Sequence, residues 1–368
     1  MTQDFLRATP FHARAGEANR LNRWENRNGF TLSSSYGDPH GEALAVRFGA
    51  VLADISWHWR VMLAGARVLE FVSRLVTRDV SRLEPGAAAP ALWLNDGGAV
   101  RGAGTVVRFG VETFLLTSET ADADWIARAA ALYGVAVHDL ASEQGVLAVA
   151  GVTAAKVLAA AGLDADVAPL ALRKFFWRGL DLAVSRLGAG YEVWCEPDDA
   201  LIVWDRLVAA GAPFALSPAG QNALDVLSLE SGVVRPGFDF APARDGFASE
   251  PSPHSLGLAP LIDAEHVCNG RTAAAGPQKI LAGILLPSET PLPQAALARA
   301  GRAAGRTLGS LYSPALRRAI ALAAVDAEAA APGTELTAGG QVCRVAALPF
   351  LPPPAPMRPP TETPPGSV

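Results

Sequence analysis

The chain has 368 residues, of which half are hydrophobic and 18% are charged. This length exceeds one ordinary core and predicts two or three domains, while the composition excludes a disordered or fibrous protein. The formal net charge of -5 comes from 31 basic and 36 acidic residues. Because these charges form no long runs, we expect a small ligand as partner, with no nucleic acid and no membrane surface.

The three cysteines, Cys195, Cys268 and Cys343, lie far apart in the sequence. They have no Cys-x-x-Cys pattern and no histidine at a spacing that suits zinc, so we expect reduced structural thiols and no metal. Residues 1–10 lack an apolar core of signal-peptide length. Since no apolar stretch reaches the roughly 20 residues that cross a bilayer, the sequence predicts a cytoplasmic protein.

Short helices and short strands alternate through the first two thirds of the chain. A hairpin is expected at residues 95–98 (NDGG), because Asn, Asp and Gly favour tight turns between strands. The mixture favours an α+β fold over a regular βαβ array. Apolar spacing predicts helices at 68–76, 121–133, 201–210 and 221–231, and strands at 91–94, 104–109 and 113–117.

The last third of the chain has a different pattern. Short apolar runs at 278–286, 309–312, 320–325 and 341–348 alternate with Gly and Pro turns, which predicts a small all-β module. Residues 352–368 are dominated by proline, so we expect a mobile tail there.

Several segments carry a family resemblance in the right order and at the right distances. They are TPFH at 9–12, DIS at 54–56, FVSRLVTRDVSRLEPG at 71–86, LNDGG at 94–98, GYEVW at 190–194, LESG at 229–232 and LPF at 348–350. Together they resemble the glycine-cleavage T protein family, which carries one-carbon units to N5 of tetrahydrofolate. The resemblance covers almost the whole chain and implies tetrahydrofolate as the cofactor.

The resemblance also implies an architecture. The family folds as an α+β cloverleaf of three domains around a central folate pocket, and the last domain is a small β-barrel. On this basis we expect a discontinuous folate-binding domain at 1–50 and 140–245, a second α+β domain at 51–139, a barrel at 246–351 and the tail at 352–368.

Glu192 matches the glutamate with which the family binds the pterin ring. A carboxylate can accept two hydrogen bonds from the ring N–H and exocyclic amine of a buried pterin. The resemblance adds Tyr191 and Tyr36 as cofactor-binding residues. The alternatives are a solvent-facing Glu192 on an alternating strand and a packing role for Tyr36.

Two hallmarks of the family are missing from the sequence. Where the family has a catalytic aspartate shortly after the hairpin, this chain has Arg101 and Gly102, and Leu224 stands in place of an arginine. The missing acid argues against glycine cleavage itself. Arg101 is a candidate catalytic residue that stabilises a developing phenolate or binds a substrate carboxylate, and the alternative is a solvated hairpin residue.

The segment Trp57-His58-Trp59 replaces a different family triplet. In the ether-cleaving branch of the family this segment presents histidines, so the resemblance implies His58 as a catalytic proton donor. An ether requires protonation of its departing oxygen, whereas a sulfonium or quaternary ammonium donor does not. Trp57 and Trp59 are candidate substrate-binding residues; the alternative is that both are core residues with His58 exposed between them.

The sequence therefore predicts a tetrahydrofolate-dependent methyltransferase. It would act as a demethylase on a small methoxy, methylamino or sulfonium compound. One alternative is a non-catalytic folate-binding paralogue, although residues 265–271 do not reproduce the signature of that group. Another is a T-like partner of an oxidative sarcosine or dimethylglycine demethylase, which would need a flavoprotein partner because the chain has no Gly-x-Gly-x-x-Gly motif.

Overall fold

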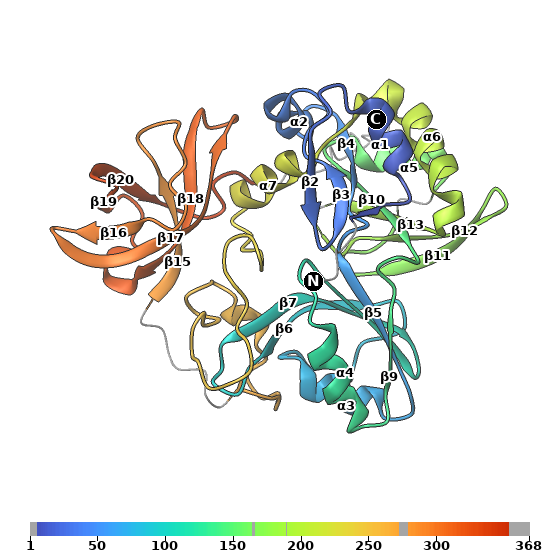
Figure 1. The fold of residues 1–368 in the computed structure, drawn as a ribbon, viewed down its shortest axis with the longest axis horizontal. Helices are drawn as coiled ribbons and strands as arrows, with labels where there is room; N and C mark the ends of the chain where they lie inside the picture. The colour runs from blue at the N-terminus through green and yellow to red at the C-terminus, as the bar shows by residue number, and fades with distance from the viewer. Residues whose placement is uncertain (1–5, 164–165, 189, 272–278, 353–368) are drawn as a thin grey trace, which may run out of the picture.

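A computed structural model describes residues 6–163, 166–188, 190–271 and 279–352. Its elements form three lobes in a cloverleaf, and the third lobe is a closed barrel, as the resemblance predicted (Figure 1). The tail expected at 352–368 lies outside the described residues apart from Pro352. No helix in the described ranges is long and apolar enough to cross a membrane.

The first lobe is built on a six-stranded sheet that draws its strands from distant parts of the chain. Helices α5 (Ala154–Ala161) and α6 (Ala200–Gly211) pack against it through a large apolar core. In β13, Glu192 pairs with Ala148 of β10 on one side and with Ser185 of β12 on the other. The strand order is β11 (Leu172–Trp177), β12 (Leu180–Ser185), β13 (Tyr191–Cys195), β10 (Gly145–Ala150), β4 (Ala50–Asp54) and β14 (Leu216–Pro218).

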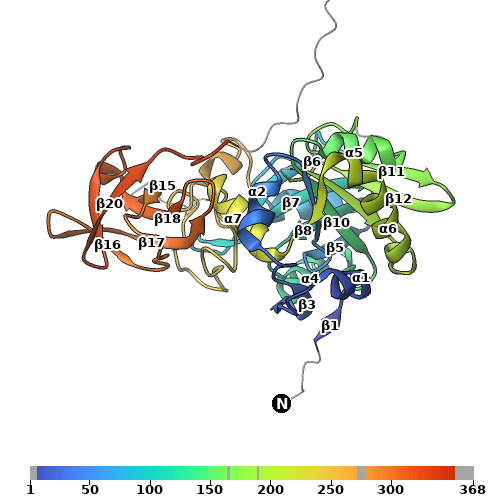
Figure 2. The same cartoon turned by 90° about the horizontal axis from the view of Figure 1, so that it is seen from above.

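The N-terminal residues add a small layer to this lobe. Figure 2 shows β1 and α1 on the side from which the N-terminus leaves the molecule. The sequence patterns predicted none of these short elements, since each has too few residues for a clear period. They are β1 (Arg7–Ala8), α1 (His12–Ala18), β2 (Trp24–Arg27), β3 (Phe30–Ser33) and α2 (Pro39–Ala45).

The second lobe is a five-stranded antiparallel sheet covered by two helices. The predicted helices at 68–76 and 121–133 are found as α3 (Val68–Leu75) and α4 (Ala123–Ala131). The predicted hairpin is also found: the Asn95 side chain accepts hydrogen bonds from the backbone N–H groups of Gly97 and Ala99. The strand order is β6 (Ala88–Leu94), β7 (Val100–Gly110), β8 (Thr113–Ser118), β5 (Trp59–Ala64) and β9 (Ala136–Asp139).

The third lobe is the predicted all-β module. Its strands close a barrel whose core combines alanines, including Ala319, Ala321 and Ala323, with larger aliphatic side chains. Strands β16 and β19 were missed by the sequence analysis because each spans only four residues. The barrel order is β15 (Lys279–Leu285), β18 (Arg318–Asp326), β17 (Arg302–Ser313), β16 (Ala296–Arg299), β19 (Glu335–Ala338) and β20 (Gln341–Ala346).

Helix α7 (Gln221–Glu230) joins the first lobe to the barrel. Its last residue, Glu230, is 2% exposed. One carboxylate oxygen of Glu230 accepts a hydrogen bond from Ser313 of the barrel at 2.5 Å, and the other pairs with Arg47 of the first lobe at 2.7 Å. The backbone carbonyl of Glu230 accepts a further bond from Leu351. This buried carboxylate therefore ties two lobes together.

The strand pairing bears on where one lobe ends and the next begins. The boundary expected at residue 51 falls inside β4, which pairs with β10 and β14 of the six-stranded sheet. We therefore propose a boundary after Asp54. The residues before the barrel contact the second lobe, since Thr77 donates to the carbonyl of Leu261 at 2.8 Å and His266 contacts the carbonyl of Ser73 at 2.8 Å. We propose that the barrel lobe proper begins at β15.

Candidate functional site

A cavity of about 480 Å³ lies where the six-stranded sheet meets the start of β5 and helix α7; we call it the central cavity. Its volume falls in the usual range for small-ligand sites, about 300–1,000 Å³. Its wall includes Ile55, Trp57, His58, Glu119, Ala148, Leu187, Tyr191, Glu192, Gln221, Leu224, Ser228 and Arg235. Four of the seven predicted site residues, Trp57, His58, Tyr191 and Glu192, are among them.

Glu192 presents a carboxylate to this cavity. One oxygen accepts a hydrogen bond from the Ser185 hydroxyl at 2.7 Å, and the same Ser185 oxygen accepts from the Trp194 indole at 2.9 Å. Burial raises the pKa of Glu192, although these contacts and the charge of Arg60 oppose the rise. The second oxygen has no hydrogen-bond partner among the described residues. The side chain is thus fixed on one side and has acceptor capacity on the other.

Arg60 organises the turn between β4 and β5. Arg60 is 1% exposed, and its guanidinium donates to the carbonyls of Ile55, Ser56 and His58 at 2.7, 2.9 and 3.0 Å. Burial lowers the pKa of Arg60 to about 10, and the nearby charge of Glu192 opposes this effect. The sequence analysis missed this residue. A buried cation that binds three carbonyls of one turn fixes the path of that turn along the cavity wall.

His58 lies in the cavity wall and its ring meets the ring of Trp57 edge-on at 4.5 Å. Burial lowers the pKa of His58 well below its usual value, and the positive charges of Arg60, Arg235 and Arg27 lower it further. This lowered pKa gives no support to the proton-donor role that the resemblance implied for His58. At pH 7 the ring is neutral and carries no acidic proton of the kind that an ether oxygen needs.

This depressed pKa predicts how stability depends on pH. Below about pH 6.5 the unfolded chain binds a proton at His58 that the folded chain does not bind, so the free energy of unfolding falls on acidification from that pH. His58→Gln should make this dependence shallower. Urea unfolding between pH 5 and 7.5 measures it, and a midpoint at or above 6.5 for the imidazole resonance of His58 in an NMR titration would contradict it.

The two predicted substrate-binding tryptophans lie in different places. Trp57 is 5% exposed and lines the cavity, and its indole donates to Gln221 at 3.0 Å. Gln221 in turn donates to the backbone carbonyl of Asp54 at 2.8 Å, which anchors the tryptophan to the end of β4. Trp59 is 3% exposed and belongs to the core of the second lobe. Because β5 begins at Trp59, the chain turns between the two residues and they do not share a face.

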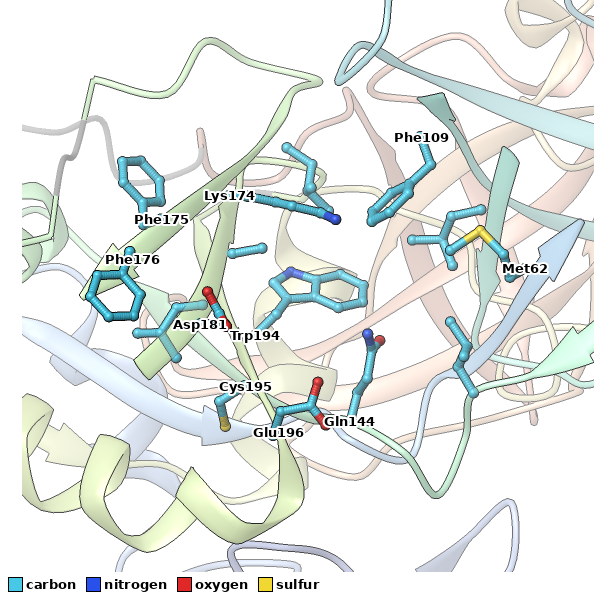
Figure 3. A pocket seen from close by; sticks show the side chains of 15 residues that line it. Met62, Phe109, Gln144, Lys174, Phe175, Phe176, Asp181, Trp194, Cys195 and Glu196 are labelled. Carbon is cyan, nitrogen blue, oxygen red and sulfur yellow. The ribbon is translucent and has the colours of Figure 1, made fainter. Parts of the chain in front are cut away.

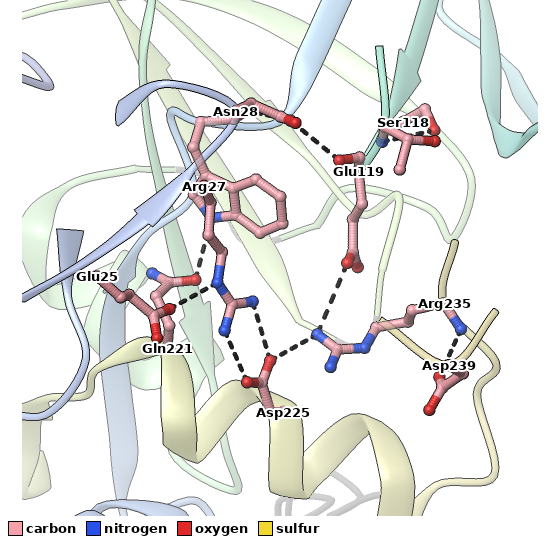
Figure 4. A network of polar contacts seen from close by, with 11 residues as sticks. Glu25, Arg27, Asn28, Ser118, Glu119, Gln221, Asp225, Arg235 and Asp239 are labelled. Atoms are coloured by element: carbon pink, nitrogen blue, oxygen red, sulfur yellow. Dashed lines mark hydrogen bonds and ion pairs between the residues drawn. The ribbon is translucent and has the colours of Figure 1, made fainter. Parts of the chain in front are cut away.

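A network of charged side chains lies beside Trp57, whose ring centre is 5.2 Å from the Arg27 guanidinium. Figure 4 shows this network. Arg27 from β2 binds both oxygens of Asp225 at 2.9 and 2.6 Å and pairs with Glu25 at 2.6 Å. Arg235 pairs with Asp225 at 2.8 Å and with Glu119 at 3.6 Å. The sequence analysis missed these residues.

Glu119 and Arg235 are the members of this network that also line the cavity. Burial raises the pKa of Glu119, against the lowering effect of Arg235 and Arg27. The signal in the sequence was the position of Glu119 two residues after the predicted strand at 113–117, because polar side chains at strand ends often reach a site.

The two predicted cofactor-binding tyrosines are both largely buried. Tyr191 lines the central cavity, while its ring belongs to the core of the first lobe and lies under Arg186. Tyr36 does not line the central cavity. It borders a shallow hollow with Asp38 and Glu42, and burial raises its pKa. Tyr36 belongs to the apolar core of the first lobe, which agrees with the packing role given above as its alternative.

Arg101 is 6% exposed and does not line the central cavity. Its Nε and Nη2 atoms bind both oxygens of Asp122 at 2.5 and 2.9 Å, and Nη1 pairs with Asp245. Its guanidinium also stacks on Trp125 at 4.3 Å. The geometry gives no support to the predicted catalytic role for Arg101, because two carboxylates and a ring occupy the guanidinium. The alternative of a solvated hairpin residue is wrong.

Gly102 pairs with Trp93 across the β6–β7 hairpin, and the Trp93 indole fills the space beside it. A Cβ atom at Gly102 would lie 2.1 Å from the indole ring. No side chain, and so no aspartate, fits at this position while Trp93 keeps its place. Trp93 thus occupies the space that a side chain at position 102, such as the family's aspartate, would need.

Gly102→Ala should consequently destabilise the chain by about 1–3 kcal/mol, the usual cost of overpacking a core. Trp93→Leu opens the space, so the double variant Trp93→Leu with Gly102→Ala should be less destabilised than the sum of the two single changes. Chemical denaturation of the four proteins gives this coupling energy. Strict additivity would show that the two positions do not compete for space.

A second cavity of about 530 Å³ is lined by Trp194, Lys174, Asp181 and Glu196 among others (Figure 3). It is larger than the central cavity, but its charged residues, Lys174, Asp181 and Glu196, are all exposed. The Lys174 amine lies 4.4 Å from the Phe109 ring centre. Since none of the predicted site residues lines it and no buried charged group enters it, the central cavity is the better candidate. Within the described ranges, no cluster of three or more His, Cys, Asp or Glu residues has the geometry of a metal site.

Comparisons with known proteins agree with the fold. Residues 11–254 match the GCVT N-terminal domain, and residues 279–354 match the glycine cleavage T-protein C-terminal barrel domain. The chain is 34% identical to the aminomethyltransferase of Frankia alni over 300 residues, which are 77% of this chain and 80% of that protein. It is 30% identical to the aminomethyltransferase of Geobacillus thermodenitrificans over 84% of this chain and 87% of that protein.

A solved structure is similar over nearly the whole length. The aminomethyltransferase T of the Bartonella henselae glycine cleavage system superposes with a TM-score of 0.83 at 22% identity, covering 94% of this chain and 98% of that one. These relatives give no support to the expectation that the chain departs from glycine cleavage, since they carry the aminomethyltransferase name. The family uses tetrahydrofolate, and the cavity volume and the acceptor capacity of Glu192 suit a pterin. The chain belongs to the glycine-cleavage T protein family of folate-dependent aminomethyltransferases.

Proposed function

We propose that this chain is a tetrahydrofolate-dependent methyltransferase, which demethylates a small methoxy, methylamino or sulfonium compound in the central cavity. The observation that carries the proposal is a pair of cavity carboxylates with different surroundings. Burial raises the pKa of both; Glu192 is fixed by Ser185 and has a free acceptor oxygen, while Glu119 is half-buried and pairs with Arg235 at 3.6 Å. Such a pair supplies one group that binds and one group that exchanges a proton.

Each cavity residue has a part in this proposal. Glu192 accepts hydrogen bonds from the pterin and sets its orientation. Trp57, anchored by Gln221, offers an aromatic wall for the methyl donor. Glu119 takes over the proton donation that was first expected of His58, because its raised pKa keeps a proton available closer to neutral pH. His58 remains a neutral wall residue that can donate one hydrogen bond.

Tetrahydrofolate, when bound, would supply the N5 lone pair, so that an N5–CH₃ bond would form as the donor's CH₃–O, CH₃–N or CH₃–S bond breaks, and N5 would then release the proton that it carried. The departing heteroatom keeps the bonding electrons, and an ether oxygen then needs a proton. Glu119 can deliver that proton, and the cavity holds the reacting groups together and limits water. A sulfonium donor needs no proton, so Glu119 would matter less for it.

A second candidate is aminomethyl transfer itself. The names of the relatives at 34% and 30% identity favour it. In that case an aminomethyl group on a carrier protein is the donor and free methylated compounds are poor substrates. Gly102, which leaves no room for the family aspartate, is the feature that favours the methyl donor over this candidate.

The test is incubation of the purified chain with tetrahydrofolate and a panel of methoxybenzoates, methylated amines and sulfonium compounds. Mass spectrometry follows 5-methyltetrahydrofolate. Formation of this product with one class supports the proposal and names the donor class. Tight folate binding without product across the panel, together with methylenetetrahydrofolate formed from an aminomethylated carrier protein, would favour the second candidate.

A further inference from the structure

Two carboxylates of the second cavity face each other across neighbouring strands. The pairing of β12 with β13 places Leu182 opposite Cys195. Continued by one residue, this register puts Asp181 opposite Glu196, whose backbone is still extended. Opposed residues in a sheet have Cβ atoms about 4.5–5.5 Å apart, and like charges in that arrangement are destabilising. Both carboxylates line the second cavity without a hydrogen-bond or ion-pair partner in the described ranges, so the pair lacks a counter-ion.

A third acceptor continues this row of side chains. The pairing of β10 with β13 puts Gly145 opposite Cys195, so the same register places Gln144 beside Glu196. The side chain of Gln144 lines the second cavity, and its amide oxygen has no hydrogen-bond partner among the described residues (Figure 3). The row therefore presents two carboxylates and an amide to one cavity.

The chain's own cation in this cavity does not serve these acceptors. Lys174 is the basic residue among the described residues that line the second cavity. Its amine lies over the Phe109 ring, 4.4 Å from the ring centre, and forms no ion pair in the part of the chain that the structure describes. The charges that line the cavity are thus one positive and two negative, which favours a cationic ligand.

The second lobe contributes an apolar wall to the same cavity. Met62 of β5, Phe109 of β7 and Leu115 of β8 supply it. On the first-lobe side, the Phe176 ring is 77% exposed and also lines the cavity. A volume of about 530 Å³ is in the usual range for small-ligand sites. A ligand here would meet carboxylates on the sheet and carbon on the facing lobe.

The second cavity is separate from the central cavity, although one strand serves both. Glu192, Trp194 and Glu196 are alternate residues and so point to the same face of the sheet. Glu192 lines the central cavity, whereas Trp194 and Glu196 line the second. The two cavities share no lining residue among the described residues. Both can therefore be filled at once.

We propose that the second cavity binds a small organic cation with an apolar body. Its ammonium group lies between Asp181 and Glu196, and its body packs against Phe109 and Met62. An ammonium group has three hydrogen-bond donors, which match the two carboxylates and the amide oxygen of Gln144. An anion would add a third like charge, and a neutral molecule would leave the two carboxylates opposed. This site does not depend on the proposed function.

The test compares three probes that share one aromatic body: phenethylammonium, 2-phenylethanol and 3-phenylpropionate. Calorimetry at low salt measures their binding to the full chain with saturating tetrahydrofolate and again without it. The wild-type chain should bind phenethylammonium about tenfold more tightly than the other two, as expected for two partly exposed charge pairs. Methylammonium, which has the charge without the body, should bind about tenfold more weakly than phenethylammonium. Tetrahydrofolate should change none of these constants by more than about twofold.

Variants of the lining residues locate the site. Asp181→Asn and Glu196→Gln should each weaken phenethylammonium binding about threefold, and the double variant should lose the preference for the cation. Lys174→Met should strengthen the binding, because it removes a competing positive charge. Asp198→Asn changes an exposed acid that does not line the cavity, so it is the control and should keep the wild-type affinity.

Three outcomes overturn the proposal. The first is a wild-type chain that binds phenethylammonium no more tightly than 2-phenylethanol. The second is a double variant with an undiminished preference, since the two carboxylates would then not hold the cation. The third is displacement of the cation by tetrahydrofolate, which would place it in the central cavity. A chain that does not bind tetrahydrofolate removes the proposed function, whereas the probe and variant comparisons without folate still report on the second cavity.

Discussion

Glu192→Gln is expected to raise the dissociation constant for tetrahydrofolate about tenfold or more. The substitution keeps the side-chain shape and an oxygen for the Ser185 hydroxyl, but it removes the charge and replaces one acceptor with a donor. Losing a charge-assisted hydrogen bond in a buried site costs about 1–3 kcal/mol, which is about 5- to 150-fold in affinity. Isothermal titration calorimetry with the purified chain measures the change.

The matched control for this experiment is Glu196→Gln. Glu196 is an exposed glutamate that follows β13 and lines the second cavity. Its affinity for tetrahydrofolate should stay within about twofold of wild type. An unchanged dissociation constant in Glu192→Gln would show that this carboxylate does not bind folate, and the second cavity would then become the candidate folate site.

Glu230→Ala is expected to reduce the free energy of unfolding by about 3–5 kcal/mol. The change removes the buried partner of an ion pair and leaves the partly exposed Arg47 without its carboxylate and Ser313 without its acceptor. Because Glu230 connects the first lobe to the barrel, the barrel should also become easier to detach, and the unfolding transition should broaden or split. Differential scanning calorimetry and urea unfolding measure both effects.

Two comparisons check the origin of that loss. Glu230→Gln keeps an acceptor for Ser313 and should cost less than the alanine change. Glu335→Ala removes an exposed pair with Arg344 at the barrel surface and should change stability by no more than about 1 kcal/mol. A Glu230→Ala protein as stable as wild type would show that apolar packing of α7, and not its last carboxylate, holds the barrel in place.

Local features of the sequence predicted local structure well. The hairpin at Asn95 followed from residues that favour turns over a span of four positions. The helix α3 followed from the helical spacing of Val72 and Leu75, which are buried on its apolar face. The family resemblance supplied the cloverleaf and the barrel, because motifs in a fixed order carry information about topology that periodicity lacks.

The candidate site was predicted less well, for two physical reasons. Its charged network depends on contacts between distant residues: Arg27 and Asp225 are separated by 198 positions, and no local pattern links them. The pKa of His58 depends on burial and on charges from three other elements, so residue type alone suggested the wrong protonation state. The spacing of Trp57 and Trp59 implied one strand, whereas β5 begins only at Trp59.

The six-stranded sheet of the first lobe and the five-stranded sheet of the second lobe differ in how far apart their strands lie in the sequence. All five strands between Trp59 and Asp139 come from one continuous stretch, whereas β4 must wait for partners that follow it by almost a hundred residues. During synthesis the five-stranded sheet of the second lobe can therefore form on the ribosome while β4 is still unpaired. The unpaired β4 exposes apolar residues and free backbone groups, which favours aggregation. Slow translation just after residue 150 would lengthen that vulnerable interval, and fast translation there would shorten it.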